Sequence, residues 1–384
     1  MSDDAPARSP ATRRVSCAFV QFSEMFCFPA HTVGHLNMCD AMTALGVETT
    51  LYMLPPEGVA LPSPLDLAWK YGLSAPPRVE WVRPDANKWI ARLRVLRECA
   101  RIGRRVTFTY CTRALPTLGA LLGGSTKAVI EIHQPSRFWS RHDRLAFRLA
   151  RRSRRLRIVC ISQQLAGIVA REWGVDESTI IVEHSAHNFP IRDDYATVVG
   201  DRGRLCVMYV GSFDSGKGLD TVFEIARLHP EVDVIAVGGE VPLRHLPHNL
   251  EVRPRVAHAD VPDLLAKADI LLMPFNTYAG GGLPSGAAGV AEEFYSPLKM
   301  VEYLSAGRVI MASNLPSIAE VLEDGVNSLL VDPDSLASWS AALDRLESDP
   351  ALRMRLAHGA AQTARRHTTR ERARRVLVGI GVLR

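Results

Sequence analysis

A lysine and a glutamate lie close together in the segment 293–307, at a spacing that suits a phosphorylated ribose. Ser296 and Pro297 are typical of a helix start, with the serine as the cap and the proline in the first turn. The free amides and partial positive charge of a helix start attract a phosphate, and Lys299 adds a full charge there. Glu302, in the second turn, can accept hydrogen bonds from a diol such as a ribose. The segment therefore predicts a site for a nucleotide diphosphate.

A second group of residues suited to phosphate follows another apolar run in the same half of the chain. The run 205–210 ends at Gly211, and a turn rich in glycine and serine leads to Lys217 near the start of a helix. Backbone amides in such a turn, together with one lysine, can cradle a phosphate. The alternative is an ordinary strand-to-helix turn with a solvated lysine. The presence of the 296–299 element in the same half favours the phosphate interpretation.

In the first half of the chain, His133 ends an apolar strand-like run. A histidine at the carboxyl end of a central parallel strand is expected at the ligand-binding edge of the sheet. The alternative is a histidine that bonds only to nearby backbone. Glu131 is expected to be a structural partner within the same strand. Gly34 and His35 stand at a predicted helix start and Arg113 follows another strand, so these residues are weaker candidates for lining the site.

These residues lie between strand-like and helix-like segments that alternate, which predicts parallel sheets covered by helices. Strands are predicted at 15–20, 47–53, 106–110, 128–132, 157–161, 205–210, 232–237, 269–274, 309–312 and 328–331. Helices are predicted at 33–45, 88–102, 138–152, 336–346, 351–365 and 370–378, with another after residue 162. The alternation breaks at 184–202, which is the predicted linker. The predicted domains are 15–190 and 203–366, followed by a C-terminal helix at 367–384.

The stretch Ser-Pro-Leu-Lys-Met-Val-Glu-Tyr-Leu-Ser-Ala-Gly at 296–307, with the residues that follow it to 331, resembles the donor-binding core of family 4 retaining glycosyltransferases, the glycosyl transferases group 1. The resemblance implies an α/β protein of GT-B architecture, with two Rossmann-like domains facing across a cleft. It implies transfer of a sugar, with retention, from a nucleotide-diphosphate sugar such as a UDP-sugar to a hydroxyl acceptor. It also implies that neither a metal nor another cofactor takes part. By the same resemblance, 15–190 is the acceptor-side domain, with Gly34, His35 and Arg113 on the acceptor side, and 203–366 is the donor domain. In this architecture the C-terminal helix at 367–384 could return to the first domain.

Residue by residue, the resemblance assigns catalytic roles to His133, Lys217 and Glu293. The donor-binding residues that it implies are Gly211, Ser212, Lys217, Val256, Ser296, Pro297, Leu298, Lys299 and Glu302. Ser212 stands where the family usually has an arginine. The first glutamate of the family's Glu-x7-Glu motif would fall on Phe294, so Glu293, one residue away, is the candidate for binding the donor sugar.

The same residues are compatible with other functions. An epimerase or hydrolase of nucleotide sugars could use the same fold and would need an acid–base pair around His133. A catalytically silent nucleotide-sugar-binding or membrane-binding protein is also compatible with the departures from the family pattern. The acceptor of a transferase could be a glycan, a lipid-linked molecule or a small natural product.

The composition is that of an ordinary two-domain globular protein, with 384 residues, 47% hydrophobic and 23% charged. The start of the sequence lacks the apolar segment of a signal peptide, no run is long enough to span a bilayer, and the seven cysteines contain no Cys-x-x-Cys pair. These features predict a cytoplasmic protein with free thiols. No group of residues has metal-ligand spacing.

The segment 137–157 is rich in arginine, and five of its arginines recur at helical spacing. This basic segment fits a solvated helix face, the anionic surface of an inner membrane or a nucleic acid. Nucleic acid is the least favoured partner because no aromatic-rich platform accompanies the arginines. The prediction is therefore no nucleic-acid partner, with peripheral membrane contact as the alternative to a solvated face.

Overall fold

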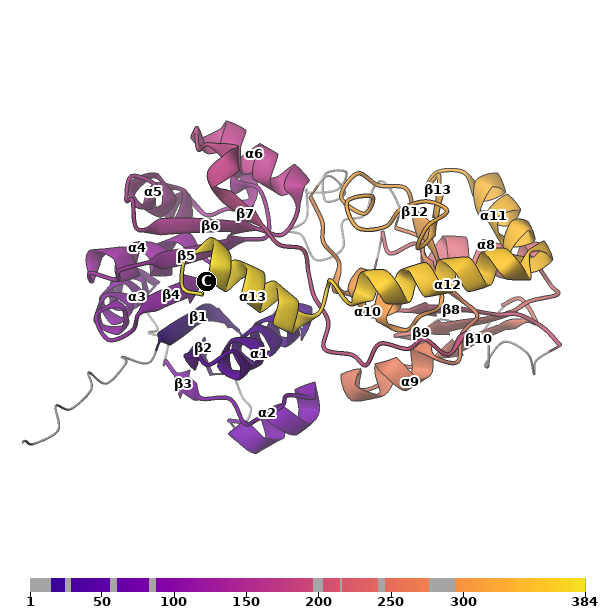
Figure 1. Ribbon diagram of the computed structural model, residues 1–384, viewed down its shortest axis with the longest axis horizontal. Helices are drawn as coiled ribbons and strands as arrows, with labels where there is room; N and C mark the ends of the chain where they lie inside the picture. The colour runs from indigo at the N-terminus through magenta and orange to yellow at the C-terminus, as the bar shows by residue number, and fades with distance from the viewer. Residues whose placement is uncertain are drawn as a thin grey trace, which may run out of the picture.

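The computed structural model describes residues 15–24, 29–55, 61–82, 88–195, 203–214, 216–240, 246–275 and 294–383. Within these residues the chain forms two separate parallel sheets, each covered by helices (Figure 1). The predicted α/β class with two Rossmann-like domains is confirmed.

The first sheet has seven strands in the order β3-β2-β1-β4-β5-β6-β7, and each neighbouring pair is parallel. Its strands are β1 (Ser16–Glu24), β2 (Glu48–Leu54), β3 (Val79–Trp81), β4 (Phe108–Cys111), β5 (Ala128–Ile132), β6 (Leu156–Cys160) and β7 (Ile180–Val182). Strand order reverses between β1 and β4. Open α/β sheets bind ligands at the carboxyl ends of the strands beside such a reversal.

The second sheet repeats this arrangement with six parallel strands in the order β10-β9-β8-β11-β12-β13. Its strands are β8 (Cys206–Val210), β9 (Asp233–Val237), β10 (Leu250–Arg253), β11 (Ile270–Met273), β12 (Val309–Ser313) and β13 (Leu329–Val331). All residues of β11 and β12 are buried. Buried central strands of parallel sheets are expected to be apolar along their whole length, which made these two strands recognisable in the sequence.

The helices of the first domain are α1 (Pro29–Ala44), α2 (Pro64–Tyr71), α3 (Lys88–Gly103), α4 (Ala114–Leu122), α5 (Arg141–Ala150) and α6 (Gln163–Trp173). Those that follow are α8 (Leu219–Leu228), α9 (Val261–Leu265), α10 (Leu298–Ser305), α11 (Leu336–Ser348), α12 (Pro350–Ala364) and α13 (Thr369–Gly379). No helix among the described residues is long and apolar enough to cross a lipid bilayer.

The last helix of the chain, α13, lies on the first domain although it follows α12 of the second (Figure 1). It packs against α1, and its residues Ala373, Val376 and Leu377 are buried in the core of the first domain beside Leu36. Burying a valine or leucine side chain contributes about 1.5–3 kcal/mol. The packing of α13 therefore connects the two domains in addition to the covalent linker.

The helix predicted at 138–152 is shorter in the structure. A single 3-10 turn covers Ser136–Phe138, and α5 begins only after Ser140, whose hydroxyl accepts a hydrogen bond from the amide of Asp143. A serine cap bonds to the amide three positions later and fixes the first helical turn there. The basic helix is therefore Arg141–Ala150.

Candidate active site

The candidate site lies where the carboxyl ends of the second sheet meet the first domain. Helix α10 follows β11 in the chain, and its first residue, Leu298, packs against the hydrophobic cores of both domains. Phe294, just before α10, is 1% exposed and packs in the core of the first domain, and its carbonyl accepts a hydrogen bond from Ser162. The segment that resembles a donor-binding element is therefore located at the domain junction.

Two lysines meet at this junction. The Nζ atom of Lys217 lies 5.1 Å from the ring centre of Phe275, and the Nζ atom of Lys299 lies 5.5 Å from the same ring centre. Lys299 also lies 3.9 Å from the ring centre of Tyr209, and Lys217 lies 5.3 Å from that of Tyr295. Aromatic faces attract a cation but do not neutralise it. The two positive charges are thus held side by side among aromatic rings.

The electrostatics of this lysine pair favour an anion. Burial lowers the pKa of Lys299 well below its usual value, and the nearby charge of Lys217 lowers it further, against the opposite effect of Glu302. Burial also lowers the pKa of Lys217, against the effect of Asp214. Among the described residues no carboxylate forms an ion pair with either lysine. Two desolvated cations beside each other gain most from a ligand with two negative charges, such as a diphosphate.

Gly211 makes room for this arrangement. A Cβ atom at Gly211 would lie 2.5 Å from the Nζ atom of Lys299, so any larger residue would displace the lysine. Gly218, at the start of α8, has a φ angle of +75°, and a Cβ atom there would lie 1.5 Å from the carbonyl oxygen of Pro274. Ser212 donates a hydrogen bond of 2.6 Å to Asp214, which ties this serine into the turn between β8 and α8.

The predicted helix cap at Ser296 is wrong. Helix α10 begins at Leu298, its N-cap position is Pro297, and no side chain caps it. Instead, the hydroxyl of Ser296 accepts a hydrogen bond of 2.8 Å from the amide of Ser185, and Ser185 donates one of 2.5 Å to the carbonyl of Ser296. Ser296 thus attaches the loop before α10 to the segment that follows β7. The first amides of α10 are left without a side-chain cap, which suits an anion at that end.

Glu302 has a partner that the sequence did not reveal. Its Oε1 atom lies 2.8 Å from the Nε2 atom of His258, and the ring of His258 packs 4.9 Å from that of Phe189. Val256, two residues before His258, is partly buried against the same core as Leu298. His258 follows β10 at the carboxyl edge of the sheet. This position after a strand was the only feature of the sequence that could have marked His258 as a site residue.

In the first domain, His133 and His35 come together at the carboxyl edge. Their ring centres are 6.0 Å apart, His35 is 5% exposed, and its Nδ1 atom contacts the side chain of Gln21. The Nε2 atom of His133 lies 2.8 Å from Oε1 of Glu131. Glu131 is thus a structural partner of His133, as the sequence suggested.

The other predicted residues are placed as follows. Gly34 lies in α1 next to His35, and a Cβ atom there would meet nothing within 4 Å. Arg113 occupies the N-cap position of α4 and pairs with Asp143 of α5 at 3.4 Å. Glu293 lies outside the described residues.

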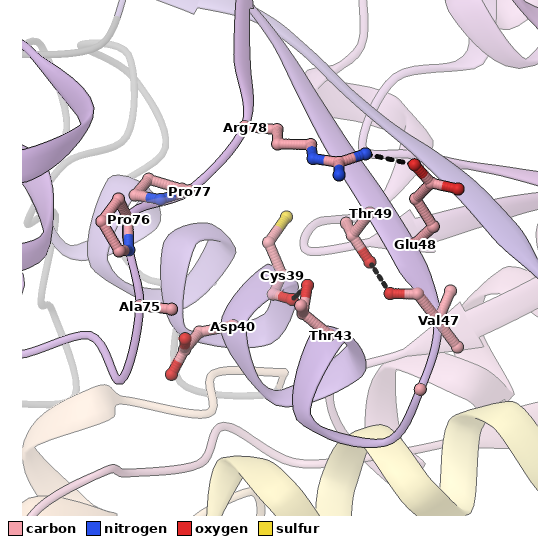
Figure 2. Close-up of a pocket in the computed structure, with 11 residues that line it drawn as sticks. Cys39, Asp40, Thr43, Val47, Glu48, Thr49, Ala75, Pro76, Pro77 and Arg78 are labelled. Atoms are coloured by element: carbon pink, nitrogen blue, oxygen red, sulfur yellow. Dashed lines mark hydrogen bonds and ion pairs between the residues drawn. The ribbon is translucent and has the colours of Figure 1, made fainter.

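A hollow of about 460 Å³ lies elsewhere in the first domain. Figure 2 shows that it is bordered by the end of α1, the start of β2 and the segment 75–78, with Arg78 paired to Glu48 at its rim. Since Glu48 begins β2, this hollow lies at the amino edge of the sheet. It is therefore distinct from the candidate site at the carboxyl edge.

One group of potential metal ligands also lies at an amino edge, in the second domain. His229, Asp344 and Glu347 bring ligand atoms within 4.8 Å of one another. His229 precedes β9 and bonds to Glu231 at 3.0 Å and to Ser340 at 2.8 Å. This group is remote from the lysine pair and does not belong to the candidate active site.

Comparison with known proteins shows a related family for part of the chain. Residues 198–363 match the family model of glycosyl transferases group 1. The second domain therefore resembles the group 1 glycosyltransferases. This match confirms the resemblance read from the 296–331 stretch.

A curated relative of this chain is a D-inositol 3-phosphate glycosyltransferase from a Nocardioides species. It is 28% identical over 176 residues, which cover 46% of this chain and 33% of the relative. The match thus spans about a third of the relative's length.

Solved glycosyltransferase structures resemble the whole chain. A glycosyltransferase from Rickettsia africae has a TM-score of 0.69 at 13% identity, covering 95% of this chain and 97% of that one. Anabaena HepE, solved with UDP and glucose, has a TM-score of 0.67 at 15% identity, covering 96% of this chain and 100% of that one. The similarity shows that the two Rossmann-like domains form a GT-B fold.

Proposed function

We propose that this protein is a retaining glycosyltransferase that moves a sugar from a nucleotide-diphosphate sugar to a hydroxyl acceptor. The observation that carries the proposal is the pair of partly buried lysines, Lys217 and Lys299, beside the uncapped start of α10. Breaking the bond between sugar and diphosphate leaves negative charge on the departing oxygen. Preorganised cations and amides stabilise that charge as it develops and lower the barrier.

The other residues fit the remainder of such a donor. Glu302, oriented by His258, would accept hydrogen bonds from the ribose, with Val256 close by. His133 would bond to hydroxyls of the transferred sugar, and Glu293 is the candidate for the same sugar's other side. The acceptor hydroxyl would attack from the face that the diphosphate leaves, and the leaving phosphate oxygen would take its proton. No protein nucleophile is needed, and the two lysines supply the positive charge that a metal would otherwise provide.

HepE was solved in complex with UDP-glucose, so UDP-sugars are the first donors to test. We expect release of UDP that depends on an acceptor, from a panel that includes glycans, lipid-linked sugars, natural products and inositol phosphate, and that survives EDTA. Lys217→Ala should lower turnover by about 100-fold or more, whereas Lys267→Ala, at an exposed lysine of the same domain, should leave it unchanged. Release without acceptor would indicate a hydrolase, and binding without release would indicate a silent protein. Either result would refute the transferase.

We also propose that the enzyme works in the cytoplasm and touches an anionic membrane through its first domain. Helices α3, α4 and α5 are neighbours, and their exposed leucines are Leu93 at 67%, Leu122 at 70%, Leu145 at 57% and Leu149 at 46%. The arginines of α3 include Arg94, Arg97 and Arg101, and those of α5 include Arg141 and Arg148, with Arg151 following α5. Leucines enter the headgroup region while each arginine near an anionic surface adds about 1 kcal/mol.

Cosedimentation with lipid vesicles tests this contact. We expect binding to vesicles with 30% anionic lipid and little to zwitterionic ones, with loss of binding in the variant Leu145→Ser with Leu149→Ser. Met354→Ser, at a residue of α12 that is 48% exposed, serves as the control. Equal sedimentation of both vesicle types, or retention on nucleic acid alone, would contradict the proposal.

A further inference from the structure

Glu131 is a charged residue inside the core of the first domain. It lies on β5 and is only 4% exposed, yet its carboxylate is held by three groups from three elements. The hydroxyl of Tyr110 on β4 donates to it, Nε2 of His133 lies 2.8 Å away, and Nη2 of Arg372 on α13 lies 3.1 Å away. A carboxylate at such a depth is tolerated only when it is paired and hydrogen-bonded.

Arg372 is equally well held. It is 6% exposed, and its Nε atom donates a hydrogen bond of 2.8 Å to the carbonyl of His184 in the interdomain linker. Its remaining donors reach Glu131, the carbonyl of Glu183 and the sulfur of Met38. Burial alone would raise the pKa of Glu131, but the charge of Arg372, together with the contacts from His133 and Tyr110, lowers it well below its usual value. Glu131 is therefore ionised at neutral pH.

An ionised Glu131 fixes the proton of the neighbouring imidazole. An ionised oxygen 2.8 Å away would repel a lone pair on Nε2, so the contact favours the form of His133 that carries its proton on Nε2. In a neutral imidazole the other nitrogen, Nδ1, is then the hydrogen-bond acceptor. Glu131 and His133 are two residues apart, and His133 directly follows the end of β5, so an extended chain brings both side chains to the same face of the sheet.

We propose that Glu131 and Arg372 are positioning residues for His133, so that the last helix of the chain sets which nitrogen of this histidine faces the reacting sugar. The inference deepens the proposed function, since it rests on His133 as a ligand of the donor sugar. Helix α13 follows the donor domain in sequence and delivers Arg372 into the acceptor-side domain. The end of the chain thereby forms part of the support of the active site. The contact of α13 with the first domain thus supports His133 as well as holding the two domains together.

The alternative is an ion pair that only attaches α13 to the sheet. A matched control separates the two, because Arg375, on the same helix, pairs at 2.8 Å with Glu183, which directly follows β7. Arg375 does not contact Glu131 in the described structure. Both arginines attach α13, and only Arg372 acts on the carboxylate that holds His133. A purely structural role predicts that removing either arginine has the same effect.

The test uses the full chain labelled with 15N-histidine, because ring 15N shifts report which nitrogen carries the proton. We expect the wild type to show the Nε2–H form of His133, assigned with His133→Gln. Glu131→Gln and Arg372→Met should shift it toward a mixture of forms, Arg375→Met should not, and Arg372→Lys should restore the wild-type spectrum. This readout needs no substrate, so it is independent of whether glycosyl transfer is found.

Kinetics provide the second readout. Glu131→Gln and Arg372→Met should lower kcat by at least about tenfold with little change in KM for the donor, since the support of a binding group is lost while the lysine pair is intact. If a variant fails to fold, Arg372→Lys and Glu131→Asp keep the comparison possible. An unchanged His133 spectrum in Glu131→Gln, or an equal loss of kcat in Arg375→Met, would overturn the inference.

Discussion

At the scale of single residues, Lys299 shows a conflict between stability and function. Its ammonium group is buried against Tyr209 and Phe275, near a second cation, and its Nζ atom has no hydrogen-bond partner among the described residues. A buried charge without a partner destabilises the folded state. A buried cation that carries such a cost is a candidate for binding, because the ligand would supply the missing charge.

This conflict leads to a prediction for Lys299→Met, which keeps the length of the side chain and removes its charge. We expect the free energy of unfolding to rise by about 1 kcal/mol or more and Tm by a few degrees, while the affinity for UDP falls by at least about tenfold. Thermal unfolding and calorimetric titration measure the two effects. Lys267→Met should change neither. A less stable Lys299→Met variant that still binds UDP normally would show that the lysine serves the fold.

The candidate site was only partly predictable at this scale. Lys299 and Glu302 belong to one local motif, and Lys217 lies beside a glycine-rich turn. The types and spacing of these three residues were therefore visible in the sequence. His258 was missed because its contact with Glu302 spans 44 residues and belongs to no motif. The cap at Ser296 was wrong because a tertiary bond to Ser185, 111 residues away, replaced the local one. A local sequence pattern cannot show whether a serine caps the helix that follows it or bonds to a distant segment.

At the scale of elements, the N-terminus of α6 is capped by a residue of the other domain. Both carboxylate oxygens of Glu320 accept backbone hydrogen bonds there, from Gln163 at 2.7 Å and from Gln164 at 2.9 Å. Oε2 of Glu320 also lies 2.7 Å from Nε2 of His184 in the linker. A negative charge at a helix start is favourable because of the free amides and the helix dipole. Glu320 therefore fastens the second domain to a helix of the first.

We predict that Glu320→Gln loosens this junction. Burial by itself raises the pKa of Glu320, but the bonds from His184 and the two amides lower it overall, so the ionised form is the one that stabilises the fold. The variant should lose about 1–2 kcal/mol of stability and show faster hydrogen exchange at the start of α6. The exposed Glu323→Gln on the same loop is the control. Unchanged exchange at Gln163 and Gln164 would contradict the prediction.

Helices and strands were predictable where burial produces a continuous apolar pattern in the sequence. They were missed where contacts with distant residues determine the secondary structure. Strands β5, β11 and β12 were found within one residue because both of their faces are buried, whereas β1 runs four residues beyond its predicted end. Helix α4 was missed because Pro116 and Gly119 resemble helix breakers. The proline sits in the first turn, where it costs little, and a Cβ atom at Gly119 would lie 2.8 Å from the carbonyl of Leu96, so the glycine permits close packing on α3.

At the scale of the whole molecule, the two chain connections between the domains lie side by side. The amide of His187, in the linker, donates to the carbonyl of His367, and Thr369 donates back to His187, at 3.0 and 2.9 Å. His367 joins α12 to α13, and its ring lies 6.0 Å from that of His184. Three histidines thus gather where both connections pass, and Arg372 and Arg375 lie on the helix that follows. Protonation at this place would introduce charge into an already positive region.

We predict that stability falls when the pH is lowered through the ordinary titration range of histidine. Burial, with the charges of His184, Arg375 and other neighbours, lowers the pKa of His367 to about 4, and burial also lowers that of His187. Between pH 6.5 and 4 the unfolded chain therefore binds more protons than the folded one, so stability rises with pH in that window. For His367 the full effect is at most about 3 kcal/mol, reached near pH 4.

Urea unfolding at pH 7.5, 6.5, 5.5 and 5 measures this dependence above the range where most carboxylates titrate. His367→Gln should flatten the curve, because the side chain that must lose its proton on folding is gone. His248→Gln, at an exposed histidine of the second domain, should leave the slope as it is. Since both connections meet at His367, acid should also increase exchange at the amides of His187 and Thr369 before the two sheets unfold. A slope that is the same in all three proteins would mean that other groups carry the proton uptake and that this junction is insensitive to pH.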